Sequence, residues 1–205
     1  MLVKPNNYDE VQVNQDFERL ELGGHKGVII KAKEYTSDVS GKTSLKVYVD
    51  TAKDDKQPGY FKKQYDNDTR KDKKYPNGAI KYVSLGDSET QVKMLKAFIT
   101  AVENSNSGYT FDWKKEVDQL KGKKVGLIFG LEEYTKQDGS TGTVTKLNQF
   151  RSIDKVDNAL IPRVKLLDGS YRDYDDYAEE KQENKSNDPF KDYGDVVEID
   201  DNFLD

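Results

Sequence analysis

The chain has 205 residues, of which 34% are hydrophobic and 35% are charged, so its apolar content is low for a single domain of this length. It has no cysteine and one histidine, which excludes disulfide bonds and zinc sites built from thiolates or several imidazoles. No apolar run approaches the roughly 18 residues that span a bilayer, and the first residues carry no signal-peptide pattern. We therefore expect a cytoplasmic protein that makes no membrane contact.

The net charge of −5 hides an asymmetry between two parts of the chain. Residues 1–165 contain 29 Lys and Arg against 24 Asp and Glu, whereas residues 166–205 contain 4 against 14. Binding of a polyanion depends on the local field rather than on the total charge. The sequence thus combines a basic body with an acidic C-terminal segment.

The first half of the chain predicts three strands. GVIIKAKEY (27–35) and SLKVYVDTA (44–52) are rich in β-branched residues and flank the turn SDVSGKT, which predicts a hairpin. Residues 53–77 are polar and contain several rings, and we expect a loop or a further hairpin there. The turn signal Asn77-Gly78 precedes AIKYVSL (79–85), which predicts another strand.

The second half begins with the clearest helix, over 88–104. Ser88 and Gln91 fit a capping box, and the apolar residues fall at helical spacing. These are Val92, Leu95, Phe98, Ile99 and Val102, flanked by Met94 and Ala101. A short helix through WKKEVDQL (113–120) and two strands around the DGSTG turn, 123–134 and 143–153, complete the pattern.

Five or so strands with one helix before the last pair predict a mainly β fold, an OB-like barrel with one inserted α-helix. Other small α+β barrels have similar element counts and stay as alternatives. We expect the folded domain to span residues 1–162. Residues 163–205 are acidic and without periodicity, which predicts a disordered tail.

The segment YFKKQYDNDTRKDKKY (60–75) interleaves rings with basic residues. Single-stranded nucleic acid requires this combination, because cations follow the phosphates while exposed rings stack on bases. The alternative is that Phe61 and Tyr65 are core rings and the lysines form an ordinary solvated surface. Trp113 has the same two options, stacking residue or core ring, and its pattern favours the core. His25, in GGHKG, is predicted to be an exposed loop histidine.

No arrangement of residues indicates catalysis. The carboxylate pairs Asp54-Asp55 and Glu132-Glu133 lack a partner histidine or metal-ligand spacing, and no glycine pattern matches a nucleotide-binding loop. We therefore expect a protein that is not an enzyme and has neither a cofactor nor a metal.

Three segments resemble a family of small proteins from phages and prophages of Gram-positive bacteria, several of which are described as single-stranded DNA-binding proteins. The segments are YFKKQYDNDTRKDKKYPNG, KAFITAVENSNSGYTFDW and KGKKVGLIFGLEEY with the later FRS, and the likeness covers residues 8–155. The resemblance implies a non-enzymatic protein that coats single-stranded DNA in the host cytoplasm during phage replication and recombination.

Carried onto this chain, the resemblance places aromatic and basic candidates for DNA binding in the ring-bearing segment: Tyr60, Lys62, Lys63, Tyr65, Arg70, Lys73, Lys74 and Tyr75. The first hairpin corresponds to the face that OB-folds offer to nucleic acid, which adds Lys31, Lys33 and Tyr48. Trp113 completes the set of candidates.

The last residues, EIDDNFLD, are similar to the acidic, Phe-bearing tips of bacterial and T7-type phage single-stranded DNA-binding proteins, although here Leu204 and Asp205 follow the phenylalanine. This similarity implies that the tail competes with DNA and recruits phage or host replication and recombination proteins. The residues implied in that contact are Asp200, Asp201, Phe203 and Leu204. The alternatives are a tail that serves only solubility, or a phage protein that binds a host nuclease or replication enzyme by DNA mimicry. Homo-oligomer formation is left open.

Overall fold

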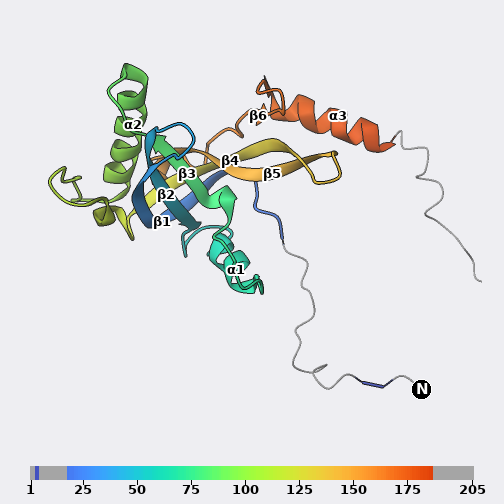
Figure 1. The fold of residues 1–205 in the computed structure, drawn as a ribbon, viewed down its shortest axis with the longest axis horizontal. Coiled ribbons are helices and arrows are strands. Elements are labelled where there is room, and N and C mark those ends of the chain that lie inside the picture. The colour runs from blue at the N-terminus through green and yellow to red at the C-terminus, as the bar shows by residue number, and fades with distance from the viewer. Residues whose placement is uncertain (1–2, 5–17, 187–205) are drawn as a thin grey trace, which may run out of the picture.

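The computed structural model describes residues 3–4 and 18–186 (Figure 1). Its strands are β1 Gly23–Thr36, β2 Thr43–Thr51, β3 Ile80–Ser84, β4 Lys124–Thr135, β5 Thr141–Arg151, β6 Val164–Lys165 and β7 Tyr171–Arg172. Its α-helices are α1 Tyr60–Asn67, α2 Glu89–Ser105 and α3 Tyr174–Ser186, and short 3-10 turns are η1 Asn77–Ala79, η2 Val117–Leu120 and η3 Ile153–Lys155. The predicted mainly β fold with a helix between the third and fourth strands is confirmed.

The predicted first hairpin forms, and its alternating pattern sets the two faces of the sheet. In β2, Leu45, Val47 and Val49 are buried on one face while Lys46 and Tyr48 lie on the other. The strand β1 pairs antiparallel with β2 and is interrupted by an irregularity between Ile29 and Lys31. It starts at Gly23, four residues earlier than predicted, so the GGHKG segment belongs to the sheet and not to a turn.

The seven strands form one sheet in which β4 is central. The order is β3-β2-β1-β4-β6-β7, and β5 pairs with β4. One edge of β4 is shared, since β1 pairs with its first half and β6 with Glu132 in its second half. The strands β3 and β5 approach each other, yet no ladder of hydrogen bonds joins them within the described residues. The sheet is therefore open at this point.

The helix α2 covers the core and begins as predicted. The Ser88 hydroxyl accepts a hydrogen bond from the Gln91 backbone N–H at its N-terminus. Its second half buries Phe98, Ile99, Ala101 and Val102, whereas Val92 and Met94 in the first half are about half exposed, contrary to the prediction. Only the C-terminal half of α2 packs fully on the sheet. None of the helices in residues 18–186 is long and apolar enough to cross a membrane.

The prediction of a loop or hairpin over the ring-bearing segment is wrong for Tyr60–Asn67, which forms α1. The helix has no side-chain cap of its own. Instead, the buried Asp50 carboxylate at the end of β2 accepts hydrogen bonds from the backbone N–H groups of Phe61 and Lys62. Burial raises the pKa of Asp50, and these N–H groups oppose the rise. A residue distant in sequence thus supplies the cap, which local patterns do not reveal.

The prediction of disorder after Pro162 is wrong for residues 164–186. Val164 of β6 is fully buried, and Tyr177 of α3 is 5% exposed. The Tyr177 hydroxyl donates to the Glu133 carboxylate of β4 at 2.9 Å, so α3 is attached to the sheet. In Figure 1, α3 and β6 lie beside the outer part of the β4–β5 hairpin. Four predicted partner-binding residues lie outside the described residues: Asp200, Asp201, Phe203 and Leu204.

Candidate nucleic-acid interface

The outer faces of β1, β2 and β3 carry a set of aromatic and basic side chains. Lys31 of β1 lies opposite Tyr48 of β2, and Lys33 lies opposite Lys46. Lys46 in turn lies opposite Tyr82 of β3. Residues directly opposite in adjacent strands project to the same side. Three strands therefore present rings and cations together on a surface that the core does not cover.

Lys46 is the centre of this surface. Its ammonium nitrogen lies 5.5, 5.3 and 5.2 Å from the ring centres of Tyr35, Tyr48 and Tyr82. The Tyr35 and Tyr82 rings meet edge to face at 5.6 Å. Interaction with the Tyr82 hydroxyl, and then with that of Tyr48, raises the pKa of Lys46, so the cation is retained at neutral pH. Cation–π contacts of this kind hold the rings in a fixed arrangement.

The surface continues from the strands onto the segment that contains α1. The Tyr48 ring contacts the Tyr75 ring at 6.2 Å, and Tyr75 contacts Tyr65 of α1 at 5.9 Å. The Lys73 nitrogen lies 4.6 Å from the centre of the Tyr65 ring. Five rings and two lysines thus form a continuous series, which we call the tyrosine–lysine face: Tyr35, Tyr82, Lys46, Tyr48, Tyr75, Tyr65 and Lys73.

Some predicted ring residues also stabilise the fold. Phe61 is 3% exposed and packs 5.5 Å from Phe129, so it is a core residue, as the alternative interpretation held. Tyr60 and Tyr75 are partly buried against the same core. The Tyr75 hydroxyl donates to the Val49 carbonyl at 2.9 Å, and burial raises the pKa of Tyr75, which keeps the phenol neutral.

The predicted basic residues differ in their pairing. Lys62 forms an ion pair with Asp66 at 2.6 Å, and Arg70 pairs with Asp68 at 2.6 Å. The Arg70 guanidinium lowers the pKa of Asp68 to about 2. Part of their positive charge is therefore compensated locally. Four of the other predicted cations are exposed and make no ion pair with any described residue: Lys31, Lys33, Lys63 and Lys74.

Trp113 is not a core residue, so the favoured interpretation of its pattern is wrong. Its side chain is 70% exposed, and its ring meets the buried Phe111 edge to face at 4.8 Å. It lies in the segment between α2 and η2. Within the described part of the chain, no ring contact joins Trp113 to the tyrosine–lysine face. Phe111, two residues earlier in the same alternating pattern, takes the core position instead.

The prediction for His25 is also wrong, since this side chain is 1% exposed. Its Nδ1 lies 2.9 Å from an Asp55 carboxylate oxygen, and its Nε2 lies 3.0 Å from the Glu21 carbonyl oxygen. Asp55 also accepts from the backbone N–H groups of Lys26 and Gln57. These bonds attach the chain before β1 to the segment after β2. His25 therefore has a structural role and is not a member of the tyrosine–lysine face.

Sequence reasoning missed three members of the face: Tyr35, Lys46 and Tyr82. A signal for them was present, because Lys46 alternates with the buried residues of β2 just as Tyr48 does. Tyr82 depends on the register of β3 against β2, which the sequence pattern does not fix.

No protein-family model matches this chain, and no curated protein has significant similarity to it.

Proposed function

We propose that the tyrosine–lysine face binds single-stranded DNA without sequence preference. The observation that carries the proposal is the unbroken series of partly exposed rings with cations between them, running from Tyr82 to Tyr65. Every base has a π-face, so stacking on such rings tolerates any sequence. Duplex DNA keeps its bases paired and stacked, which favours a single strand on this surface.

The exposed cations on β1 and around α1 support contacts to the phosphates of the bound strand. Lys31 and Lys33 border the strands, and Lys63 and Lys74 border α1, each exposed. Because such binding releases counterions, its affinity falls as the salt concentration rises. The slope of log affinity against log salt concentration is about −0.7 for each phosphate neutralised on a single strand. Lys46 and Lys73 orient the rings while also adding positive charge.

The proposal extends to the fold type and to the biological setting. A meander β1–β2–β3, a helix and then the β4–β5 pair is the element order of an OB-fold, and the approach of β3 to β5 supports a partly open barrel of that type.

On the strength of the three resembling segments, we infer a non-enzymatic protein of a phage replication or recombination module. In this proposal, residues 187–205 compete with DNA and contact partner proteins.

The test is a fluorescence-anisotropy titration of labelled oligo-dT with the full chain and with the double variant Tyr35→Ala/Tyr82→Ala. Each lost stacking ring weakens binding by on the order of 1–3 kcal/mol, so the double variant should bind at least about 30-fold more weakly. Tyr82 is 41% exposed and Tyr35 is only partly buried, so thermal unfolding should change little.

Tyr134→Ala is the matched control, because this tyrosine of β4 is 45% exposed and lies outside the face. It should bind oligo-dT like the unmodified chain. If the double variant and the control bind equally well, the face is not the DNA site. If the unmodified chain binds no oligo-dT even at low salt, the proposed function fails, and capture of a protein partner becomes the next experiment.

A further inference from the structure

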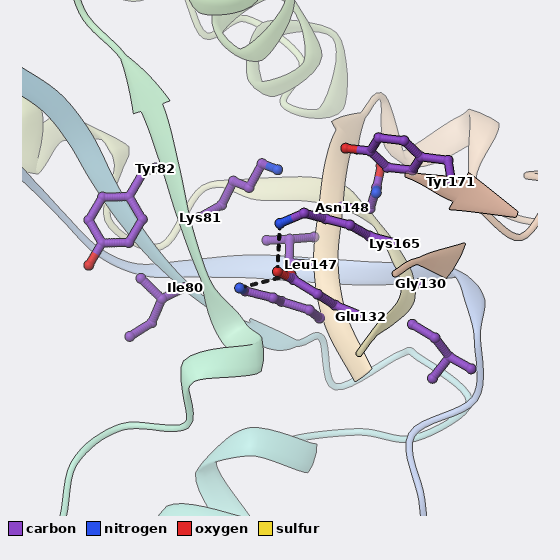
Figure 2. A pocket seen from close by; sticks show the side chains of 11 residues that line it. Ile80, Lys81, Tyr82, Gly130, Glu132, Leu147, Asn148, Lys165 and Tyr171 are labelled. Carbon is purple, nitrogen blue, oxygen red and sulfur yellow. Dashed lines mark hydrogen bonds and ion pairs between the residues drawn. The ribbon is translucent and has the colours of Figure 1, made fainter. Parts of the chain in front are cut away.

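Next to the tyrosine–lysine face, one edge of β3 pairs with no strand of the described residues, and it borders a hollow of about 290 Å³ between β3, β4, β5 and β6. This volume is at the lower limit for small-ligand sites, so it suits one phosphate group rather than a whole cofactor. Three lysines line it: Lys81, Lys146 and Lys165. Figure 2 shows Tyr82 and Tyr171 on opposite sides of this hollow.

One carboxylate faces the three ammonium groups. Glu132 pairs with Lys146 at 2.9 Å and with Lys165 at 2.8 Å. Burial would raise the pKa of Glu132, but its hydrogen bonds to Lys165 and Lys146 outweigh this and lower it, so the carboxylate is ionised. Its two oxygens are therefore occupied by two of the three cations, as the dashed lines in Figure 2 mark.

Lys81 is the remaining cation. It is partly buried and makes no ion pair within residues 18–186, and Figure 2 shows its side chain extending from β3 into the hollow. Burial, followed by repulsion from Lys146, lowers the pKa of Lys81. The hollow thus holds more positive than negative charge in a place where water is partly excluded. An anion entering it would gain a partner for Lys81 and relieve the repulsion among the lysines.

We propose that this hollow is a phosphate-binding site that takes a backbone phosphate of the same single strand that stacks on the tyrosine–lysine face. The inference rests on the proposed function, and Tyr82 is its link, since Tyr82 belongs to the face and also lines the hollow. Successive residues of a strand project to opposite sides, so Lys81 and Tyr82 flank the edge of β3 that borders the hollow. A single strand of DNA that crosses this edge of β3 places a base on Tyr82 and the adjoining phosphate at Lys81.

The experiment measures oligo-dT affinity over a series of salt concentrations for the full chain and three variants. Lys81→Gln should bind about tenfold more weakly at low salt, and its salt slope should be less steep by about 0.7. Glu132→Gln frees Lys146 and Lys165, so it should bind more tightly with a steeper slope. Lys96→Gln, an exposed lysine on α2, is the matched control and should behave as the unmodified chain. Thermal unfolding verifies that each variant is folded.

A second arm titrates thymidine monophosphate and thymidine into the full chain while NMR signals of the lysine side chains are recorded. Selective shifts of Lys81 with the monophosphate alone support the site, and they do so even if oligo-dT does not bind, in which case the phosphate source is a free nucleotide. If oligo-dT binds but Lys81→Gln and Glu132→Gln match Lys96→Gln, the phosphate site is overturned while the proposed function stands. If oligo-dT does not bind at all and the monophosphate does not shift Lys81, both proposals are overturned.

Discussion

Asp55 joins the start of the folded region to the segment after β2 through hydrogen bonds in a buried setting. The side chains of Asp55 and His25 are 3% and 0% exposed. Replacing the Asp55 carboxylate removes a buried hydrogen-bond acceptor and leaves its donors unsatisfied, which costs about 1–3 kcal/mol. We expect Asp55→Asn to lower the free energy of unfolding at pH 7 by about that amount, as measured by chemical denaturation. Asp54→Asn, at the exposed neighbouring position, should change it by less than about 0.5 kcal/mol.

Asp55 also gives the fold a pH dependence with a defined sign. Burial would raise its pKa, but the bond from His25 and those from the Gln57 and Lys26 backbone outweigh burial and lower it. A lowered pKa stabilises the fold above the unfolded-state value of about 3.9, and this stability is lost as the pH falls through the folded-state value. Asp55→Asn should therefore lose less stability than the unmodified chain between pH 5 and pH 2 (about the range in which carboxyl groups titrate). Parallel profiles for the two proteins would contradict this assignment.

At the scale of elements, regular alternation predicted the strands well, and contacts between distant residues explain the rest. The pattern of β2 identified the core face, and Tyr48 of this strand was predicted as a member of the candidate site, whereas Lys46 was missed. The helix α1 was missed because its cap is Asp50, ten residues before its first turn. The tyrosine–lysine face was predicted only in part, since the contact of Tyr75 with Tyr48 follows from the return of the chain after α1.

The helix α3 was missed because it has few apolar side chains, and these give no periodic pattern that would predict a helix. Its attachment includes one buried ring, Tyr177, the hydrogen bond from that ring to Glu133, and a longer contact of Lys181 with the same carboxylate at 4.0 Å. Burial, and then the Glu133 bond, raise the pKa of Tyr177 to about 12, so its hydroxyl keeps its proton and donates at neutral pH.

Tyr177→Phe tests this attachment by removing the hydroxyl while keeping the ring. A hydrogen bond to a charged group contributes about 1.5–3 kcal/mol, and partial exposure of the surroundings reduces this, so we expect a loss near 1 kcal/mol. Denaturant unfolding measures the loss. Limited proteolysis should also cut the segment around α3 sooner in the variant. Tyr171→Phe, at a 52% exposed position in the same segment, is the control. If the two variants have equal free energies of unfolding, the Tyr177–Glu133 hydrogen bond does not hold α3 on the sheet.

At the scale of the whole molecule, the acidic excess of the chain lies largely beyond the described fold. Residues 187–205 contain seven Asp and Glu and one Lys. Because β6, β7 and α3 belong to the folded part, a chain ending at Lys165 would lose structure together with charge. Ser186 is therefore the position at which to separate the effect of the acidic segment from that of the fold.

We expect a chain ending at Ser186 to bind oligo-dT about three- to tenfold more tightly than the full chain near 0.05 M salt, because seven acids no longer compete with phosphates for the lysines. The difference should vanish near 1 M salt, where electrostatic attraction extends only about 3 Å. The measurement is an anisotropy titration at both salt concentrations. A full-length chain with its acids at 187–205 replaced by Asn and Gln is the control, and it should bind like the shorter chain if charge is the cause. Equal affinities for the full and shorter chains at low salt would mean that the acidic segment does not compete for this face.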